Sequence, residues 1–237
     1  MWLRLPAFAL ALIAAGLLLG SGFGVRAGLW PYQTGFLLLR WALYTGIIGA
    51  AVCLVALALP KVRAGSALAL IAAAVVTLAV AYVPWQWQQR AQSVPRIHDI
   101  TTDTGNPPLF VAVLPLRAGA PNPATYGGKE IAEQQRMAYP DIAPLELAMP
   151  PDLAFMRARN AAESMDWEIV AADRAAGRLE ATATTFWFGF KDDIVVRIVP
   201  VGGDSRIDVR SVSRVGRSDI GTNAKRIREY LQRVKNS

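Results

Sequence analysis

The chain has 237 residues, a formal net charge of +7 and a pI near 9.9, a basic balance that first suggests a nucleic-acid partner. Residues 1–90, however, contain six of the 25 basic residues and none of the 18 acidic ones, so the remainder carries 19 basic against 18 acidic residues. A nucleic-acid binder carries its basic excess on the soluble part of the chain, so this class is excluded.

Three apolar runs predict a membrane domain over residues 1–90. They cover residues 5–23, 36–59 and 64–84. Each run approaches or exceeds the roughly 20 residues that a helix needs to cross a bilayer. One such run is compatible with a buried core helix, but three in succession indicate transmembrane helices and a lipid bilayer as partner. The spans lack acidic residues, which argues against a proton- or cation-coupled transporter.

The orientation follows from the charges that flank the spans. Lys61 and Arg63 lie in a short hairpin, and positive charge in a short loop favours the cytoplasmic side. Arg4 agrees with this side, whereas Arg26, Arg40, Arg90 and Arg96 argue against it. Three spans then place residues beyond 90 outside the cytoplasm. The expected location is the inner (plasma) membrane, with a periplasmic C-terminal domain. Aromatic anchors are expected at the outer interface, namely Trp30, Tyr32, Trp41, Tyr44, Tyr82, Trp85 and Trp87.

The first span has an alternative interpretation as a cleaved signal peptide. The residues Val25-Arg26-Ala27 loosely fit a small-x-small cleavage site. The apolar region is longer than the 7–15 residues usual for a signal peptide, which favours an uncleaved helix. The C-terminal domain is outside the cytoplasm under either interpretation.

Residues 91–150 are rich in proline and glycine and predict a connector followed by an irregular segment. The apolar run Leu109–Leu114 is expected to form an edge strand. Loops this long are usually functional or disordered. A third possibility is a belt wrapped around the domain and held by Tyr126, Tyr139 and Ile142.

Residues 151–237 predict a two-layer α+β domain. Short connections between the strands indicate a four-stranded antiparallel meander flanked by two helices, in the order α-β-β-β-β-α. The expected elements are a helix over 152–165, strands over 167–172, 179–188, 194–201 and 206–215, and a helix over 223–234. Thr222 or Asn223 is the expected N-cap of the last helix. Alternation along the strands places Glu180, Arg197, Asp208 and Arg210 on the face away from the helices.

The meander brings two charged, glycine-containing turns to one edge of the sheet. The candidate residues there are Lys191, Asp192, Asp193, Arg210, Ser213, Arg214, Gly216, Arg217, Ser218, Asp219 and Asn223. They lie beside the N-terminus of the last helix, which favours anions. The same residues also suit a structural lock, with arginines paired to turn carboxylates. Both interpretations stay open.

Catalytic and metal motifs are not found in the sequence. A Ser-His-Asp triad would need His98, the one histidine, which lies in the connector. The one cysteine, Cys53, excludes a disulfide within the chain, and no metal site or cofactor is expected. Asp192 and Asp193 are adjacent on a strand and point to opposite faces, which is unfavourable for one metal ion.

Two segments resemble a bacterial family, the domain of unknown function 1499. They are "FGFKDD" (188–193) and "VRSVSRVGRSDIGTNAKRI" (209–227), together with "IAPL" (142–145). The resemblance covers residues 95–235. "GAPNPATYGG" (119–128) is similar to the family's entry segment, but lacks the cysteines found in many members. The resemblance implies an envelope protein with a lipid or helical anchor and implies no activity.

The expected function is therefore that of a membrane-anchored envelope protein whose extracytoplasmic domain binds a protein partner or an anionic ligand. A membrane protein that packs against the three spans is a further candidate partner. The alternative is a hydrolase-like enzyme that acts on an envelope component and uses Asp192, Asp193 and Asp219 as acid and base groups. An enzyme is the less favoured of the two.

Overall fold

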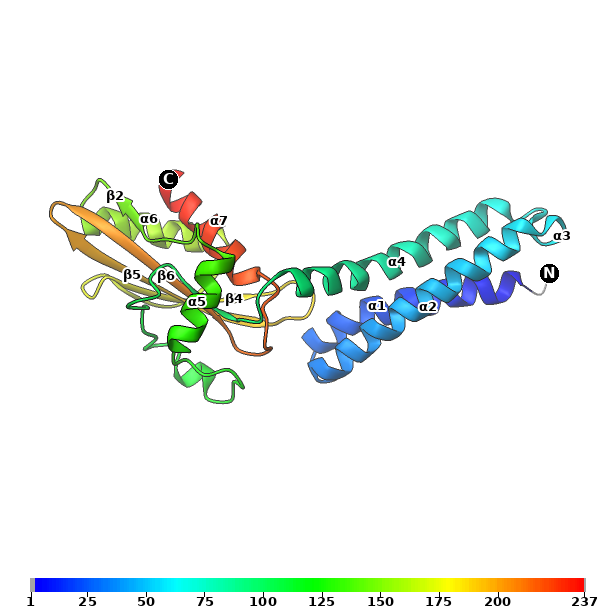
Figure 1. Cartoon of the computed structure of the whole chain (residues 1–237), viewed down its shortest axis with the longest axis horizontal. Coiled ribbons are helices and arrows are strands. Elements are labelled where there is room, and N and C mark those ends of the chain that lie inside the picture. The colour runs from blue at the N-terminus through cyan, green and yellow to red at the C-terminus, as the bar shows by residue number, and fades with distance from the viewer. Residues whose placement is uncertain (1–2, 237) are drawn as a thin grey trace. The chain divides into compact units, whose positions relative to one another are not determined.

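The computed structural model describes residues 3–236 (Figure 1). Residues 1, 2 and 237, at the outer limits of the two predicted domains, lie outside the described part. The chain divides into two compact units. The first contains the residues up to Gln92 together with Phe186–Gly189, and the second contains Ser93–Thr185 and Phe190 onward.

The first unit is helical. Its helices are α1 (Arg4–Arg26), α2 (Tyr32–Ala58), α3 (Pro60–Arg63) and α4 (Ala67–Ser93). The three predicted apolar helices are confirmed, because α1, α2 and α4 are each long and apolar enough to cross a membrane. The third was expected to end at Pro84, but α4 continues to Ser93. Proline inside a helix removes one hydrogen bond without preventing its continuation, and transmembrane helices tolerate it.

Small residues let these helices pack closely. A Cβ atom at Gly46 would lie 2.8 Å from the carbonyl oxygen of Thr77, and one at Gly49 would lie 2.7 Å from the Thr77 methyl group. Such contacts are typical of helix pairs in membranes. At one end of the unit Arg4 donates to the carbonyl oxygens of Val62 (2.7 Å) and Ala64 (2.6 Å), so Arg4 lies beside the charged hairpin.

The second unit contains an antiparallel sheet of six strands in the order β1-β6-β5-β4-β3, with β2 also paired to β6. The strands are β1 (Asp99–Thr101), β2 (Leu145–Leu147), β3 (Glu168–Asp173), β4 (Arg178–Thr184), β5 (Lys191–Val201) and β6 (Asp204–Ser213). The strands β3 to β6 pair consecutively, as the meander predicted. The predicted number of four strands was wrong, because β1 and β2 have three residues each and are too short for a periodic pattern.

Two further predictions about this unit were wrong. Residues 109–114 form no strand, and β4 ends at Thr184 rather than at Phe188. The segment expected to be irregular also contains the 3-10 helix η1 (Pro115–Arg117) and the helix α5 (Gly128–Ala138). The side chain of Gln135 in α5 accepts from the Thr101 backbone N–H (3.0 Å) and donates to its carbonyl oxygen (2.6 Å). An amide side chain thus closes the open edge of β1.

The apolar core lies between one face of the sheet and two helices, α6 (Pro151–Ser164) and α7 (Thr222–Asn236), which lie along the sheet in Figure 1. Alternate residues of β5, Ile194, Val196 and Ile198, are buried in this core. The Trp167 ring stacks on that of Tyr230, with centroids 4.8 Å apart. Two helices on one face of an antiparallel sheet were predicted and are found, but the sheet has six strands rather than four.

The opposite face of the sheet is covered by residues 103–127, here called the wrapping segment. Glu180, Arg197, Asp208 and Arg210 share this face as predicted, but Glu180, Asp208 and Arg210 are fully buried rather than exposed to water. Phe110 and Val113 of the wrapping segment pack on Val195 and Val212 of the sheet. The buried charges on this face are therefore partners of the wrapping segment.

Candidate functional site

Asp192 and Asp193 open β5 and point to opposite faces of the sheet. Adjacent residues of a strand alternate in direction, and here the two carboxylates meet different arginines. Asp193 faces the wrapping segment and pairs with Arg117 and Arg214. Asp192 faces the helices and pairs with Arg226. The candidate residues therefore form two separate clusters.

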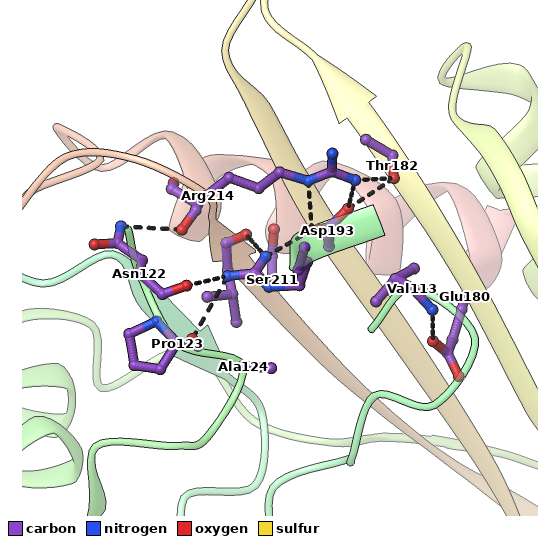
Figure 2. A network of polar contacts seen from close by, with 12 residues as sticks. Val113, Asn122, Pro123, Ala124, Glu180, Thr182, Asp193, Ser211 and Arg214 are labelled. Atoms are coloured by element: carbon purple, nitrogen blue, oxygen red, sulfur yellow. Dashed lines mark hydrogen bonds and ion pairs between the residues drawn. The ribbon is translucent and has the colours of Figure 1, made fainter. Parts of the chain in front are cut away.

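The Asp193 cluster joins three strands to the wrapping segment (Figure 2). Arg117 donates to Oδ2 of Asp193 at 2.6 Å, and Arg214 donates to both oxygens at 2.9 and 2.8 Å. The Thr182 hydroxyl donates to Oδ1 at 2.7 Å, a contact drawn as a dashed line in Figure 2. The side chain of Asp193 is fully buried and that of Arg117 is 3% exposed. All four hydrogen bonds favour the charged carboxylate.

Two opposing effects set the pKa of Asp193. Burial by itself raises this pKa, but the hydrogen bonds from the two guanidinium groups and from Thr182 outweigh burial and hold the pKa below its ordinary value of 3.8. A carboxyl with a lowered folded pKa contributes stability that is present above its unfolded pKa and is lost as the pH falls through its folded pKa. Asp193 therefore contributes to acid unfolding below about pH 4.

Replacing Thr182 by Val is expected to raise the pH at which the second unit unfolds in acid, because one hydrogen bond that favours the Asp193 carboxylate is lost. The change should also cost about 1–2 kcal/mol at neutral pH. Hydrogen exchange of the full-length protein in detergent, measured from pH 6 to pH 2, gives both quantities. Thr184→Val, at an exposed position of the same strand, is the matched control. An unchanged acid midpoint in Thr182→Val would contradict the proposed role of the hydroxyl.

The Asp192 cluster lies on the helix face. Arg226 donates to Asp192 Oδ2 at 2.6 Å and also to the side-chain oxygen of Asn223. Asn223 in turn donates to the Ser213 hydroxyl (3.0 Å) and to the carbonyl oxygen of His98 (2.9 Å). Asn223 is fully buried, so its amide connects α7, β6 and the residue before β1.

Arg210 lies away from the sheet edge, paired in register with Val195 near the middle of β5. Its guanidinium forms a two-point ion pair with Asp99, at 2.9 and 2.7 Å, and donates to the carbonyl oxygen of Ala124 at 2.7 Å. The rings of Phe110 and Tyr126 lie 5.1 and 5.4 Å from its central carbon. Arg210 is therefore the centre of the wrapping segment's attachment.

Asp219 caps α7. Its two oxygens accept from the backbone N–H groups of Gly221 (3.0 Å) and Asn223 (2.7 Å). Burial raises the pKa of Asp219, and these two hydrogen bonds oppose the rise. Thr222 or Asn223 was expected to cap the helix, but the capping side chain is that of Asp219, which lies before both residues in the chain. The anion at this helix N-terminus thus belongs to the chain itself.

The other candidates lie at the surface or in turns. Lys191 is half exposed and 4.0 Å from Glu168, and Arg217 is exposed. Gly216 has a φ of +93°, a backbone conformation that favours glycine, and its carbonyl oxygen accepts from the Asn122 amide at 2.8 Å. The Ser218 hydroxyl donates to the carbonyl oxygen of Pro95.

Several residues of these clusters were missed by sequence reasoning. Arg117 lies in a segment without periodicity, so no pattern marked it as buried. Glu180 was placed on the correct face, but its role appears only in the structure, where it accepts from the backbone N–H groups of Val111 and Val113. Figure 2 shows Val113 directed at Glu180. Asp103 similarly pairs with Arg197 and Arg206.

Within residues 3–236, no three His, Cys, Asp or Glu side chains lie close enough to hold a metal ion. A surface hollow is bordered by Ser164, Glu229 and Arg233 and by none of the candidate residues.

A family model described as a protein of unknown function, DUF1499, matches residues 99–234. The chain belongs to the DUF1499 family. The resemblance seen in the two turn segments is thus confirmed, and the matched region begins at β1 and ends in α7. No curated protein matches the chain. The DUF1499 region contains the sheet, the wrapping segment and both buried clusters, whereas α1, α2, α3 and α4 lie outside it.

Proposed function

We propose that this DUF1499 protein is a non-enzymatic, membrane-anchored envelope protein whose extracytoplasmic domain binds a protein partner through its wrapping segment. The observation that carries the proposal is a row of exposed apolar side chains on this segment, here called the apolar ridge. It consists of Leu109, Val111, Leu114 and Leu116, which are 73%, 50%, 45% and 53% exposed.

The ridge arises from alternation along the wrapping segment. Phe110, Val113 and Arg117 are buried in the domain, while the four ridge residues beside and between them remain exposed. Four large apolar residues within eight positions form more apolar surface than single scattered side chains do. Exposed patches of this kind mark interaction sites in soluble domains.

The buried charges hold the ridge in a fixed conformation. Glu180 accepts from the N–H groups of Val111 and Val113, and Arg210 donates to the carbonyl oxygens on either side of this stretch, at Pro108 (3.2 Å) and Ala124. A surface that is already ordered loses less conformational entropy when a partner binds. This supports a binding role for a segment that has little regular secondary structure.

Hydrolysis is the weaker candidate. Asp192 and Asp193 are each paired with arginine, and Asp219 accepts two backbone hydrogen bonds. A general acid or base needs a carboxyl group that substrate can reach, and these three groups are already engaged with the fold. An anionic ligand at the sheet edge would rely on the exposed Arg217 and Lys191, since Arg214 is held by Asp193.

A photo-crosslinking amino acid at Val111 tests the proposal in cells. We expect one discrete adduct of the full-length protein, lost when Leu109 is replaced by Asp. Val201 is the matched control, because it is also a valine and is 51% exposed. Mass spectrometry of the adduct distinguishes another protein from a second copy of this chain or from lipid.

Equal adduct formation at Val111 and Val201, or none at Val111, would refute the ridge as a binding surface. An adduct with lipid alone would also refute a protein partner. The proposed location is tested on the same cells by adding protease to spheroplasts. Residues beyond 93 should be degraded, and their protection would place the domain in the cytoplasm instead.

A further inference from the structure

The connection between β4 and β5 is an aromatic loop, Phe186–Gly189, that belongs to the helical unit. Its sequence is Phe-Trp-Phe-Gly. Thr185 and Phe190 on either side of the loop belong to the second unit, whereas these four residues are grouped with the helices. The first three residues were predicted to end a strand, and that prediction was wrong because their side chains pack on the helices instead.

Trp187 occupies a space that glycine leaves open on α1. A Cβ atom at Gly22 would lie 2.2 Å from Cδ1 of the Trp187 ring, closer than any real contact allows. The Trp87 ring of α4 meets Trp187 edge to face, with centroids 5.2 Å apart. The indole is therefore held between α1 and α4.

Phe188 packs on α2, at a glycine that also lets α2 approach Ser21 and Val25 of α1. A Cβ atom at Gly35 would lie 3.0 Å from its ring, and the Phe36 ring lies 5.4 Å away between centroids. Gly189 has a φ of +68° and lies against Arg26, where a Cβ atom would approach the Arg26 side chain to 3.1 Å. Glycines on both the helices and the loop thus permit this close approach.

Phe186 differs from its neighbours because it is 79% exposed. Its ring meets Phe23 edge to face at 5.7 Å, and its carbonyl oxygen accepts from Arg26 at 2.6 Å. The Arg26 guanidinium also lies 6.0 Å from the centre of the Phe186 ring. An exposed phenyl ring is thus placed beside a cation at the C-terminal end of an apolar helix.

We infer that the aromatic loop is a membrane-interface anchor whose partner is the boundary between lipid headgroups and acyl chains. The loop contacts the C-terminal end of α1 and the N-terminal end of α2, the ends at which Trp30 and Tyr32 also lie. Aromatic rings concentrate at this depth of a bilayer, and arginine reaches the headgroups from it. The inference rests on the proposed membrane anchoring, and it explains why a large apolar ring is left uncovered by protein.

Spin labels at three positions test the inference in the full-length protein reconstituted into phosphatidylcholine–phosphatidylglycerol vesicles. Cys53→Ala first removes the chain's one cysteine. Cysteines are then placed at Phe186, at Leu12, which is 75% exposed on α1, and at Val201 at the opposite end of β5. Accessibility to oxygen and to an aqueous nickel complex reports the depth of each label.

The label at Phe186 is expected to lose most of the nickel accessibility that the label at Val201 shows, and to lie at a shallower depth than the label at Leu12. A label at Leu12 that is open to nickel would refute membrane anchoring itself. A protected Leu12 with Phe186 as accessible as Val201 would refute the loop anchor alone.

The glycine socket provides a second, independent variant. Gly22→Val should displace Trp187 and shift the Phe186 label towards the accessibility seen at Val201. Gly16→Val is the matched control on the same helix, because apart from the adjacent residues and the helix's own backbone no atom lies within 4 Å of a Cβ at Gly16. An unchanged label in Gly22→Val, with the loop still protected, would show that the socket does not position the loop.

Discussion

Replacing Asp193 by Asn is expected to lower the free energy of unfolding of the second unit by about 3–5 kcal/mol, the usual cost of removing one partner of a buried ion pair. Asn preserves the volume of the side chain, so the effect isolates the charge. Arg117 and Arg214 would keep buried or half-buried charges without their carboxylate. Within the described residues, Nε of Arg117 is buried without a hydrogen-bond partner, and the other partners of this guanidinium are the uncharged backbone carbonyl oxygens of Val212, Asn122 and Pro123.

The measurement uses the full-length protein in detergent, with urea as denaturant and hydrogen exchange of β5 and β6 as the signal. Asp204→Asn is the matched control, because Asp204 is exposed at the start of β6 and should change stability by less than about 0.5 kcal/mol. Equal stability of the two variants would show that the Asp193 cluster is not a structural lock.

Replacing Arg210 by Lys is expected to cost at least about 3 kcal/mol and to release the wrapping segment. Lys keeps the positive charge but cannot reproduce the planar two-point pairing with Asp99 together with the bond to the Ala124 carbonyl oxygen. Each hydrogen bond to a buried charged group contributes about 1.5–3 kcal/mol, and at least two are lost. Exchange of the Val111 and Val113 amides should accelerate more than exchange within α7.

Arg228→Lys provides a control with the same chemistry at the surface. Arg228 also forms a two-point pair, with Asp141, but both side chains are about half exposed. Solvent screens this pair, so the substitution should cost less than about 1 kcal/mol. If Arg210→Lys behaves like Arg228→Lys, the wrapping segment is held by its apolar contacts rather than by the arginine.

The two variants also separate the lock from the proposed binding surface. The Asp193 cluster holds η1, whereas the Arg210 cluster holds the stretch that carries Leu109 and Val111. A mild variant that loosens the second stretch should weaken partner binding at the ridge before it unfolds the domain. Partner binding that is unchanged when the stretch is loosened would therefore contradict the ridge as the binding surface.

The sequence by itself determined the elements whose side chains repeat with a clear period. The apolar runs gave α1, α2 and α4, and alternation in β3 to β6 gave the meander and the face on which Glu180 and Arg210 lie. The spacing of Ile227, Tyr230 and Val234 gave α7, and the turn motifs indicated the DUF1499 family. Each is a local signal, because one element's own residues set it.

Only the tertiary structure decided what covers the second face of the sheet and where the aromatic loop lies. β1 and β2 are strands because β6 offers them an open edge, not because their three residues favour a strand. The positions of Arg117 and Phe110 depend on Asp193 and on Val195 and Val212, which are far away in sequence, so no periodic pattern marks them. Trp187 lies against Gly22 and Phe188 lies near Gly35, so the aromatic loop packs on helices that are far away in sequence, and no local pattern in residues 186–189 predicts this.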